Sequence, residues 1–234
     1  MSSFNAGNYN TAISQSASAE LISKILYPND NHTEGKILRL RQQYFFSAAS
    51  IADILQNHLN QYGTLDNLAD KVAIQLNDTH PTVAIPEMMR ILLDECSYEW
   101  DAAFDICRKV FAYTNHTVMS EALEKWNADI FRNTLPRIWQ IVCEMDRRCR
   151  ADFEKAFPGD WGKINYMAIL GDNQVRMANI CCYVCHSING VSKLHSQIIK
   201  DSVFHDYYLY KPQAFKNVTN GIAYRRWLLA STRA

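Results

Sequence analysis

The stretch VAIQLNDTHPTVAIPE, from Val72 to Glu87, decides the fold. A mostly apolar run from Val72 to Leu76 gives way to the polar residues 77–80, and Pro81 then opens an apolar pattern that continues through Leu93. The run predicts a strand and the pattern after Pro81 predicts a helix. Strand, polar loop and helix in this order are the repeating unit of an α/β protein with a parallel sheet.

The polar loop contains the first candidate site residues, Asp78 and His80. Ligands of open α/β sheets bind at the carboxyl ends of the strands, and residues two apart on extended backbone point the same way. We therefore expect both side chains to face one cleft, where a carboxylate and an imidazole can bind hydroxyls or exchange protons. The alternative is that Asp78 caps the helix and His80 is an ordinary loop residue.

A second unit of the same kind follows. Val110 to Thr114 reads as a strand, and Asn115-His116-Thr117 comes directly after it. Around the two units the apolar spacing predicts further helices. These are 10–26, 34–63, a helix from Ser120 through Trp126, 136–157, and two helical stretches between 173 and 200 joined by a loop at 187–190.

The composition argues against some classes of binding partner. Lysine plus arginine and aspartate plus glutamate are equal, at 24 each, so neither nucleic acid nor an anionic membrane is favoured as a partner. A neutral, hydroxyl-rich substrate fits better. No signal-like start and no run of about 18 apolar residues occur, which predicts a cytoplasmic protein.

Seven cysteines form no disulfide framework and indicate reduced thiols. Cys182 to His186 matches a haem-attachment spacing and could be drawn as a zinc site, but it lies within a helical pattern, so we favour buried free cysteines and predict no metal. His186 is placed at the end of that helix, next to Asn189-Gly190, where it can face a cleft.

The segment 10–26 is an amphipathic helix with a narrow stripe that includes Ile13, Ala17 and Leu21. Such a stripe packs on its own domain or against a second copy, and the pattern leaves both open. The helix must stop before Pro28, and 27–33 reads as a loop.

Several uncommon motifs occur in order along the chain. They are YPNDN (27–31), EGKILRLRQQYF (34–45), VAIQLNDTHP (72–81), AYTNHTV (112–118), LPR (135–137), INGVSKLHS (188–196), NVTNGI (217–222) and RRWLL (225–229). With these motifs the chain resembles the α-glucan phosphorylases, the glycogen, starch and maltodextrin enzymes, over almost its whole length.

The resemblance implies an α/β fold: the helix-rich, Rossmann-like later half of the N-terminal domain of a two-domain, GT-B type glycosyltransferase. Residues 1–234 would be a partial N-terminal domain, with a tower-like dimer helix (1–26), a gate loop (27–33) and a sugar-side α/β region (72–234). The cofactor domain would be absent, and the first strands would precede Met1. We expect such a sheet to expose an apolar edge.

The family resemblance also implies an activity. The full enzyme would cleave terminal α-1,4-glucosyl bonds with inorganic phosphate, giving glucose 1-phosphate with retention, as a homodimer that uses the phosphate of pyridoxal phosphate as an acid. None of the eleven lysines lies in the family's Gly-x-x-Asn-Met-Lys cofactor motif. We therefore expect this chain alone to be inactive; the alternative is a non-catalytic glucan-binding or dimerisation module.

Residue roles carry over by position in the motifs. The resemblance assigns a catalytic contact with the reacting sugar's 6-hydroxyl to His186 and a second contact with that hydroxyl to Asn220. It assigns the gate to Asp30 and Asn31, the glucan channel to Asp78 and His80, and proximity to the cofactor to Trp227. One departure concerns the last role: Ala223-Tyr224 replace the family's usual Thr-Pro before the paired arginines.

Overall fold

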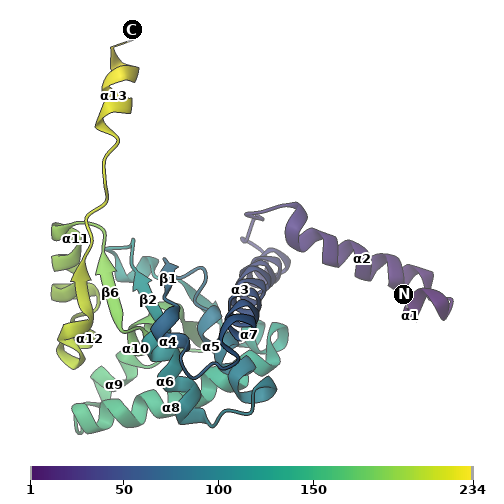
Figure 1. Cartoon of the computed structure of the whole chain (residues 1–234), viewed down its shortest axis with the longest axis horizontal. Coiled ribbons are helices and arrows are strands. Elements are labelled where there is room, and N and C mark those ends of the chain that lie inside the picture. The colour runs from purple at the N-terminus through teal and green to yellow at the C-terminus, as the bar shows by residue number, and fades with distance from the viewer. Residues whose placement is uncertain (1, 233–234) are drawn as a thin grey trace.

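A four-stranded, fully parallel sheet forms the centre of the computed structural model (Figure 1). The structure describes residues 2–232; Met1, Arg233 and Ala234, which the predicted domain range includes, lie outside the described residues. The strand order is β1-β2-β6-β7, formed by Ile74–Asn77, Phe111–Thr114, Ser187–Gly190 and Phe215–Asn217. Both sequence-predicted strands are therefore confirmed, as β1 and β2, and the structure pairs them with each other.

The register gives the sheet one apolar and one polar face. Leu76, Tyr113, Ile188 and Phe215 pair in one row and are all at most 4% exposed. The next row toward the carboxyl ends, which projects from the opposite face, is Asn77, Thr114, Asn189 and Lys216. Gln75, which lies on that same face, donates to the Thr114 hydroxyl (2.8 Å).

Strand β1 is an edge strand, and the expectation of an apolar edge is wrong for it. Its exposed residues are Gln75 and Asn77, while Leu76 is buried. The polar side chains of β1 alternate with its apolar ones, and the apolar ones face the core.

Helices surround this sheet (Figure 1). They are α1 (Ser2–Asn5), α2 (Tyr9–Lys24), α3 (Thr33–Tyr62), α4 (Leu68–Lys71), α5 (Ala84–Arg90, continued by a π-helix at Ile91–Glu95), α6 (Trp100–Val110), α7 (Ala128–Thr134), α8 (Pro136–Ala156), α9 (Trp161–Met167), α10 (Met177–Val184), α11 (Lys193–Ile198, continued by a π-helix at Ile199–Val203), α12 (His205–Tyr210) and α13 (Tyr224–Ser231). A small antiparallel sheet, β3-β5-β4, joins Lys125–Asn127, Gln174–Arg176 and Leu170–Gly171.

Two long helices begin and end where the sequence predicts. At the start of α3 the His32 side chain accepts a hydrogen bond from the Gly35 amide (3.0 Å), and the helix ends at Gly63, whose φ of +70° is a left-handed conformation that glycine adopts without strain. Helix α8 begins at Pro136, where the missing amide hydrogen costs nothing.

Two predictions of local structure are wrong. The segment from Ser120 forms only a 3-10 turn (Ser120–Ala122) before Trp126 enters strand β3. The predicted loop 187–190 is the buried strand β6. Its Gly190 is needed because helix α11 packs against it so closely that a Cβ there would lie 2.8 Å from the Ser196 amide nitrogen.

Both ends of the described chain project from this body (Figure 1). Helix α2 ends before Pro28, as predicted, and none of its residues 9–24 is buried; Ile13 is 64% exposed. Helix α13 likewise buries none of its residues. Each helix therefore leaves apolar side chains uncovered within the described part of the chain.

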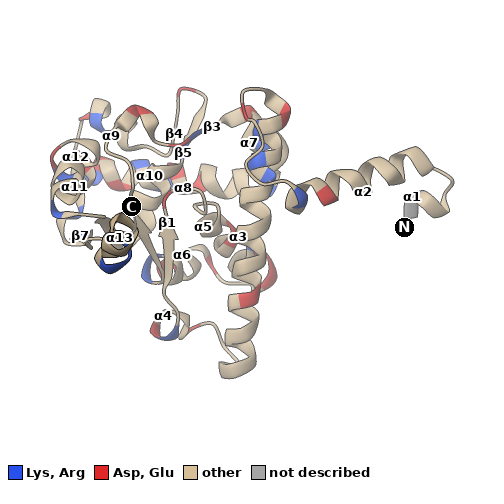
Figure 2. Cartoon of the chain, turned by 90° about the horizontal axis from the view of Figure 1, so that it is seen from above, with Lys and Arg blue, Asp and Glu red and all other residues tan. Residues whose placement is uncertain are grey.

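Charges of both signs are interspersed along the chain (Figure 2). The arginines of α8, for example, pair with nearby carboxylates: Arg147 and Arg148 with Glu144, and Arg150 with Asp146. Among residues 2–232, no helix is both long enough and apolar enough to cross a bilayer.

Candidate functional site

Asp78 shapes the end of the sheet at which the parallel strands finish, called the carboxyl edge below. Its φ of +65° turns the chain directly after β1, its amide donates to the Thr114 carbonyl (2.9 Å) and its carboxylate accepts from the Thr79 amide (2.7 Å). The backbone at Asp78 is therefore left-handed, so the expected alignment of Asp78 and His80 along extended backbone is wrong. The capping alternative also fails, because α5 begins only at Ala84, with Val83 before it.

A cleft of about 420 Å³ nevertheless brings Asp78 and His80 together. Its walls come from the loop 27–33, the segments that follow β1 and β2, and strand β3 with its neighbours. The lining consists of Asp30, Lys36, Arg39, Asp78, Thr79, His80, Thr117, Ala122, Leu123, Glu124, Lys125, Trp126, Asn127, Ile130 and Gln174. Three predicted site residues, Asp30, Asp78 and His80, thus share one cavity.

Glu124 is the best-anchored carboxylate of this cleft. Its two oxygens accept from the Gln43 amide of α3 (2.8 Å) and from the Thr79 hydroxyl (2.8 Å), and the His80 Nδ1 lies 4.0 Å away. Its side chain is only 15% exposed. Two segments distant in sequence, α3 and the loop after β1, fix this carboxylate, and no sequence pattern pointed to it.

The loop 27–33, the predicted gate, is bonded to the first turns of α3. The Arg39 guanidinium donates to the Asp30 carboxylate (3.0 Å), and the Asn29 side chain accepts from the Asn31 amide (3.0 Å). The Asn29 carbonyl packs against Gly35, where a Cβ would clash with it. Asp30 therefore faces the cleft, while Asn31 is exposed and is not among the lining residues.

Two further histidines lie at the carboxyl edge. The exposed His116, directly after β2, is 2.6 Å from the Asn77 side-chain oxygen. The buried His195 accepts from the Val191 amide through Nδ1 (3.2 Å), so its proton is on Nε2, which is 3.0 Å from the Asn115 oxygen. Neither was assigned a role from sequence, although His116 follows the second predicted strand much as His80 follows the first.

His186 is at the opposite end of the sheet. Helix α10 ends at Val184, and His186 directly precedes β6, with its amide donating to the Phe111 carbonyl at the start of β2 (3.1 Å). Because β1, β2 and β6 are parallel, His186 lies at the end of the sheet opposite Asp78, and its contact with the reacting sugar's 6-hydroxyl stays a prediction. Partial burial and the nearby Lys211 ammonium lower the pKa of His186.

The remaining predicted residues lie outside the cleft lining. The Asn220 amide donates to the Val191 carbonyl (3.0 Å), which places it near the carboxyl edge, but its side chain is exposed. Trp227 is on the projecting helix α13 and is 60% exposed.

The cysteines of the haem-like motif are buried in and just after α10. Burial raises the pKa of Cys182, and the Cys181 sulfur lies 3.1 Å from the Thr82 hydroxyl. Within residues 2–232, no group of three histidine, cysteine or carboxylate side chains is placed to hold a metal ion. These thiols therefore belong to the core.

A parallel sheet with a polar cleft at its carboxyl edge defines an α/β protein suited to a hydroxyl-rich small molecule, because carboxylates, imidazole and ammonium groups together accept and donate hydrogen bonds. Sequence comparison agrees: the chain belongs to the carbohydrate phosphorylase family, whose model matches residues 1–234.

Among its relatives are glycogen phosphorylases from Bacillus subtilis (48% identical, covering 93% of this chain), Chlamydia trachomatis (45%, 98%) and human brain (46%, 97%). The chain spans only 27%, 29% and 28% of the length of these relatives. The comparison therefore shows the family of this chain, which matches only a part of each relative.

The amino edge of the sheet gives a prediction about pH. Lys211 is buried, donates to the Tyr183 and Cys185 carbonyls (2.9 and 3.0 Å), and has its pKa lowered by burial from 10.5 to about 8. Between pH 8 and pH 10.5, Lys211 is protonated in the unfolded chain but has lost its proton in the folded chain. The contribution of Lys211 to the free energy of unfolding therefore rises with pH across this range. Relative to Lys211→Met, we expect the wild type to gain up to about 3 kcal/mol from pH 8 to pH 10.5.

Urea unfolding of both proteins across this range measures that difference. The buried cysteines oppose the trend in both proteins, so only the difference is informative. Unfolding free energies that run parallel with pH would show that Lys211 keeps its ordinary pKa in the folded chain.

Proposed function

We propose that this chain forms the sugar-binding side of a glucan phosphorylase, within a two-domain enzyme of GT-B type. The observation that supports the proposal most strongly is the cleft that joins Asp78, His80 and Glu124 in a member of the carbohydrate phosphorylase family. The whole enzyme would transfer a terminal α-1,4-linked glucosyl unit to inorganic phosphate, giving glucose 1-phosphate with retention, in the cytoplasm.

The proposed role of the cleft is to bind and orient sugar hydroxyls. Asp78 and Glu124 accept hydrogen bonds, while His80 and Lys36 donate them. Glu124 needs no rearrangement to do this, because Gln43 and Thr79 already fix its orientation. Prior orientation lowers the entropy cost of binding and favours one pose of the sugar.

Pyridoxal phosphate, in this proposal, is held by a part of the enzyme other than this chain. When bound, it supplies a phosphate group that exchanges a proton with the substrate. The buried Lys211 is a poor anchor for it, because its ammonium donates to two carbonyls at the amino edge, at the end of the sheet opposite the cleft. The residues described here therefore position the sugar rather than the cofactor.

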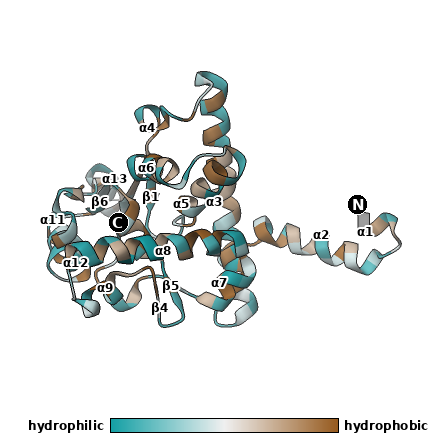
Figure 3. Cartoon of the chain, turned by 90° about the horizontal axis from the view of Figure 1, so that it is seen from below, coloured by the Kyte–Doolittle hydropathy of each residue, from teal (hydrophilic) through white to brown (hydrophobic). Residues whose placement is uncertain are grey.

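We further propose that α2 pairs with α2 of a second copy. Its apolar residues Ile13 and Leu21 are 64% and 42% exposed, and the helix projects from the body (Figure 3). A self-complementary helix pair would cover both stripes at once.

Maltotriose titration tests the cleft. We expect weak, saturable binding to the full chain that falls about tenfold in Asp78→Ala, because a hydrogen bond from a sugar hydroxyl to a carboxylate contributes roughly 1.5–3 kcal/mol. Asp105→Ala is the matched control, since Asp105 is an exposed aspartate on α6, paired with Lys109. Equal affinity in all three proteins would contradict the proposed site.

Turnover is expected to be absent in the isolated chain. Incubated with glycogen, phosphate and pyridoxal phosphate, it should release no glucose 1-phosphate. The cleft can orient a sugar, but the proposed reaction needs a correctly held cofactor phosphate, which another part of the enzyme would hold. An enzymatic assay for glucose 1-phosphate measures this directly. Its appearance would show that the chain is catalytically sufficient.

Sedimentation tests the helix pairing. Ile13→Glu should convert a dimer to a monomer, because it places a charge within the apolar stripe. Ala19→Glu, on the other side of the same helix, is the control and should leave the dimer intact. A wild-type chain that sediments as a monomer at high concentration would rule out pairing through α2.

A further inference from the structure

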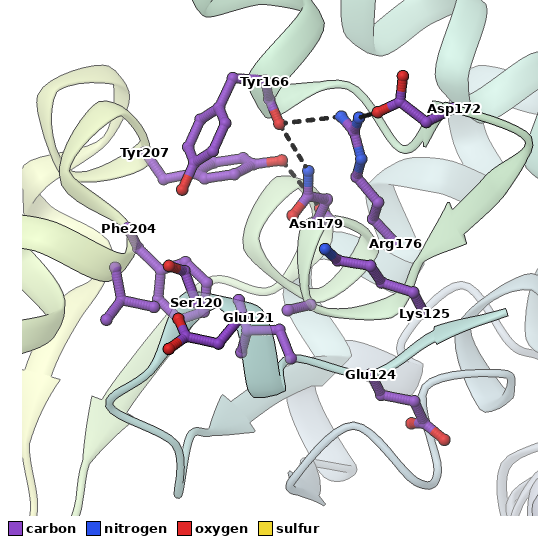
Figure 4. A pocket seen from close by; sticks show the side chains of 13 residues that line it. Ser120, Glu121, Glu124, Lys125, Tyr166, Asp172, Arg176, Asn179, Phe204 and Tyr207 are labelled. Atoms are coloured by element: carbon purple, nitrogen blue, oxygen red, sulfur yellow. Dashed lines mark hydrogen bonds and ion pairs between the residues drawn. The ribbon is translucent and has the colours of Figure 1, made fainter.

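A second cavity, of about 350 Å³, lies behind the segment that carries Glu124 (Figure 4). Residues 120–125 form one wall, and the facing wall carries Tyr166 of α9, Asn179 of α10 and Tyr207 of α12. Leu123, Glu124 and Lys125 line both this cavity and the cleft. The two spaces are therefore separated by a single stretch of chain.

Part of the polar lining is already committed to the fold. The Asn179 amide donates to the Met167 and Ala168 carbonyls (3.2 and 2.9 Å). The Arg176 guanidinium donates to the Asn165 carbonyl (2.6 Å) and to the Asp172 carboxylate (2.9 Å). These contacts make the facing wall rigid and leave it with few donors for a ligand.

The opposite wall offers groups that are free. Within residues 2–232, the side chains of Glu121 and Lys125 make no hydrogen bond or ion pair, and Figure 4 shows both on the 120–125 segment beside the cavity. Tyr166 adds an aromatic ring that is 53% exposed. The cavity therefore combines an acceptor, a donor and an apolar surface. Glu121 and Lys125 balance in charge, Asp172 is paired with Arg176, and the Glu124 carboxylate is held by Gln43 and Thr79.

These features select the ligand class. An anion would meet Glu121 and a cation would meet Lys125, so neither gains net attraction. A neutral molecule with several hydroxyls can use both groups, since a hydroxyl donates and accepts, and its carbon face can rest on the tyrosine ring. The volume is at the lower end of the range for ligand cavities.

We propose that this cavity is a second binding site for a small neutral polyol of monosaccharide or disaccharide size. Its occupant would press on residues 120–125 and so bias the Glu124 carboxylate that Gln43 and Thr79 orient in the cleft. This coupling, unlike the binding itself, rests on the proposed function of the cleft. Coupling of this kind is reciprocal, so sugar in the cleft would alter affinity in the cavity equally.

Calorimetric titration of the full chain with glucose and with maltose tests the proposal. We expect Asp78→Ala to retain saturable binding, and Asp78→Ala combined with Tyr166→Ala to lose it or weaken it about tenfold or more. Trp161→Ala in the same Asp78→Ala background is the matched control, because Trp161 is an exposed aromatic residue (62%) on the same helix, outside the cavity lining. Circular dichroism checks folding, and Glu121→Gln replaces Tyr166→Ala if the latter unfolds.

The outcomes separate the two sites. If Asp78→Ala abolishes all sugar binding, or Tyr166→Ala changes none of it, the cavity proposal is overturned while the cleft retains its proposed role. If Tyr166→Ala alone abolishes binding and Asp78→Ala has no effect, the cavity is the sugar site and the proposed function of the cleft fails. Binding of glycine in place of either sugar would show that Glu121 and Lys125 recognise a zwitterion, which also overturns the proposal.

Discussion

The parallel hydrogen-bond ladder continues one residue past the strand ends, and the rest of the site depends on it. The Asp78 amide donates to the Thr114 carbonyl and the Asn115 amide to the Asn189 carbonyl, both at 2.9 Å. These bonds bring the polar segments after β1, β2 and β6 to one edge. The loop 27–33, Glu124, His116 and His195 lie around these segments, whose backbone the ladder holds in place.

The hydrogen bonds of Glu124 connect this end of the sheet to helix α3. Gln43 belongs to α3, a long helix that also carries Arg39, the partner of Asp30. A single helix therefore contacts both the gate loop and the carboxylate on the far wall of the cleft. The segment 120–125 connects this arrangement to the cavity behind it.

Local signals in the sequence were sufficient where the chain determines its own conformation. Gly63 and Pro136 mark helix ends because their backbone preferences hold in any surroundings. Asp78 and His80 were placed correctly in one cleft, although for a reason the left-handed Asp78 contradicts.

Prediction failed where tertiary contacts decide. Residues 187–190 form a strand because β2 and β7 pair with them, and this moves His186 to the amino edge. Glu124 could not be found because its partners, Gln43 and Thr79, are 81 and 45 residues away in the chain. No periodicity within a short window records such contacts.

The polar row across the sheet has a consequence for folding fidelity. Gln75 donates to Thr114, and the Thr114 hydroxyl donates to the buried Asn189 oxygen (2.9 Å). A one-residue slip between strands would leave the Asn189 amide group buried without this partner and turn apolar side chains toward the polar face. The row thus penalises a one-residue slip among β1, β2 and β6, and it favours the register in which the polar segments after these strands meet.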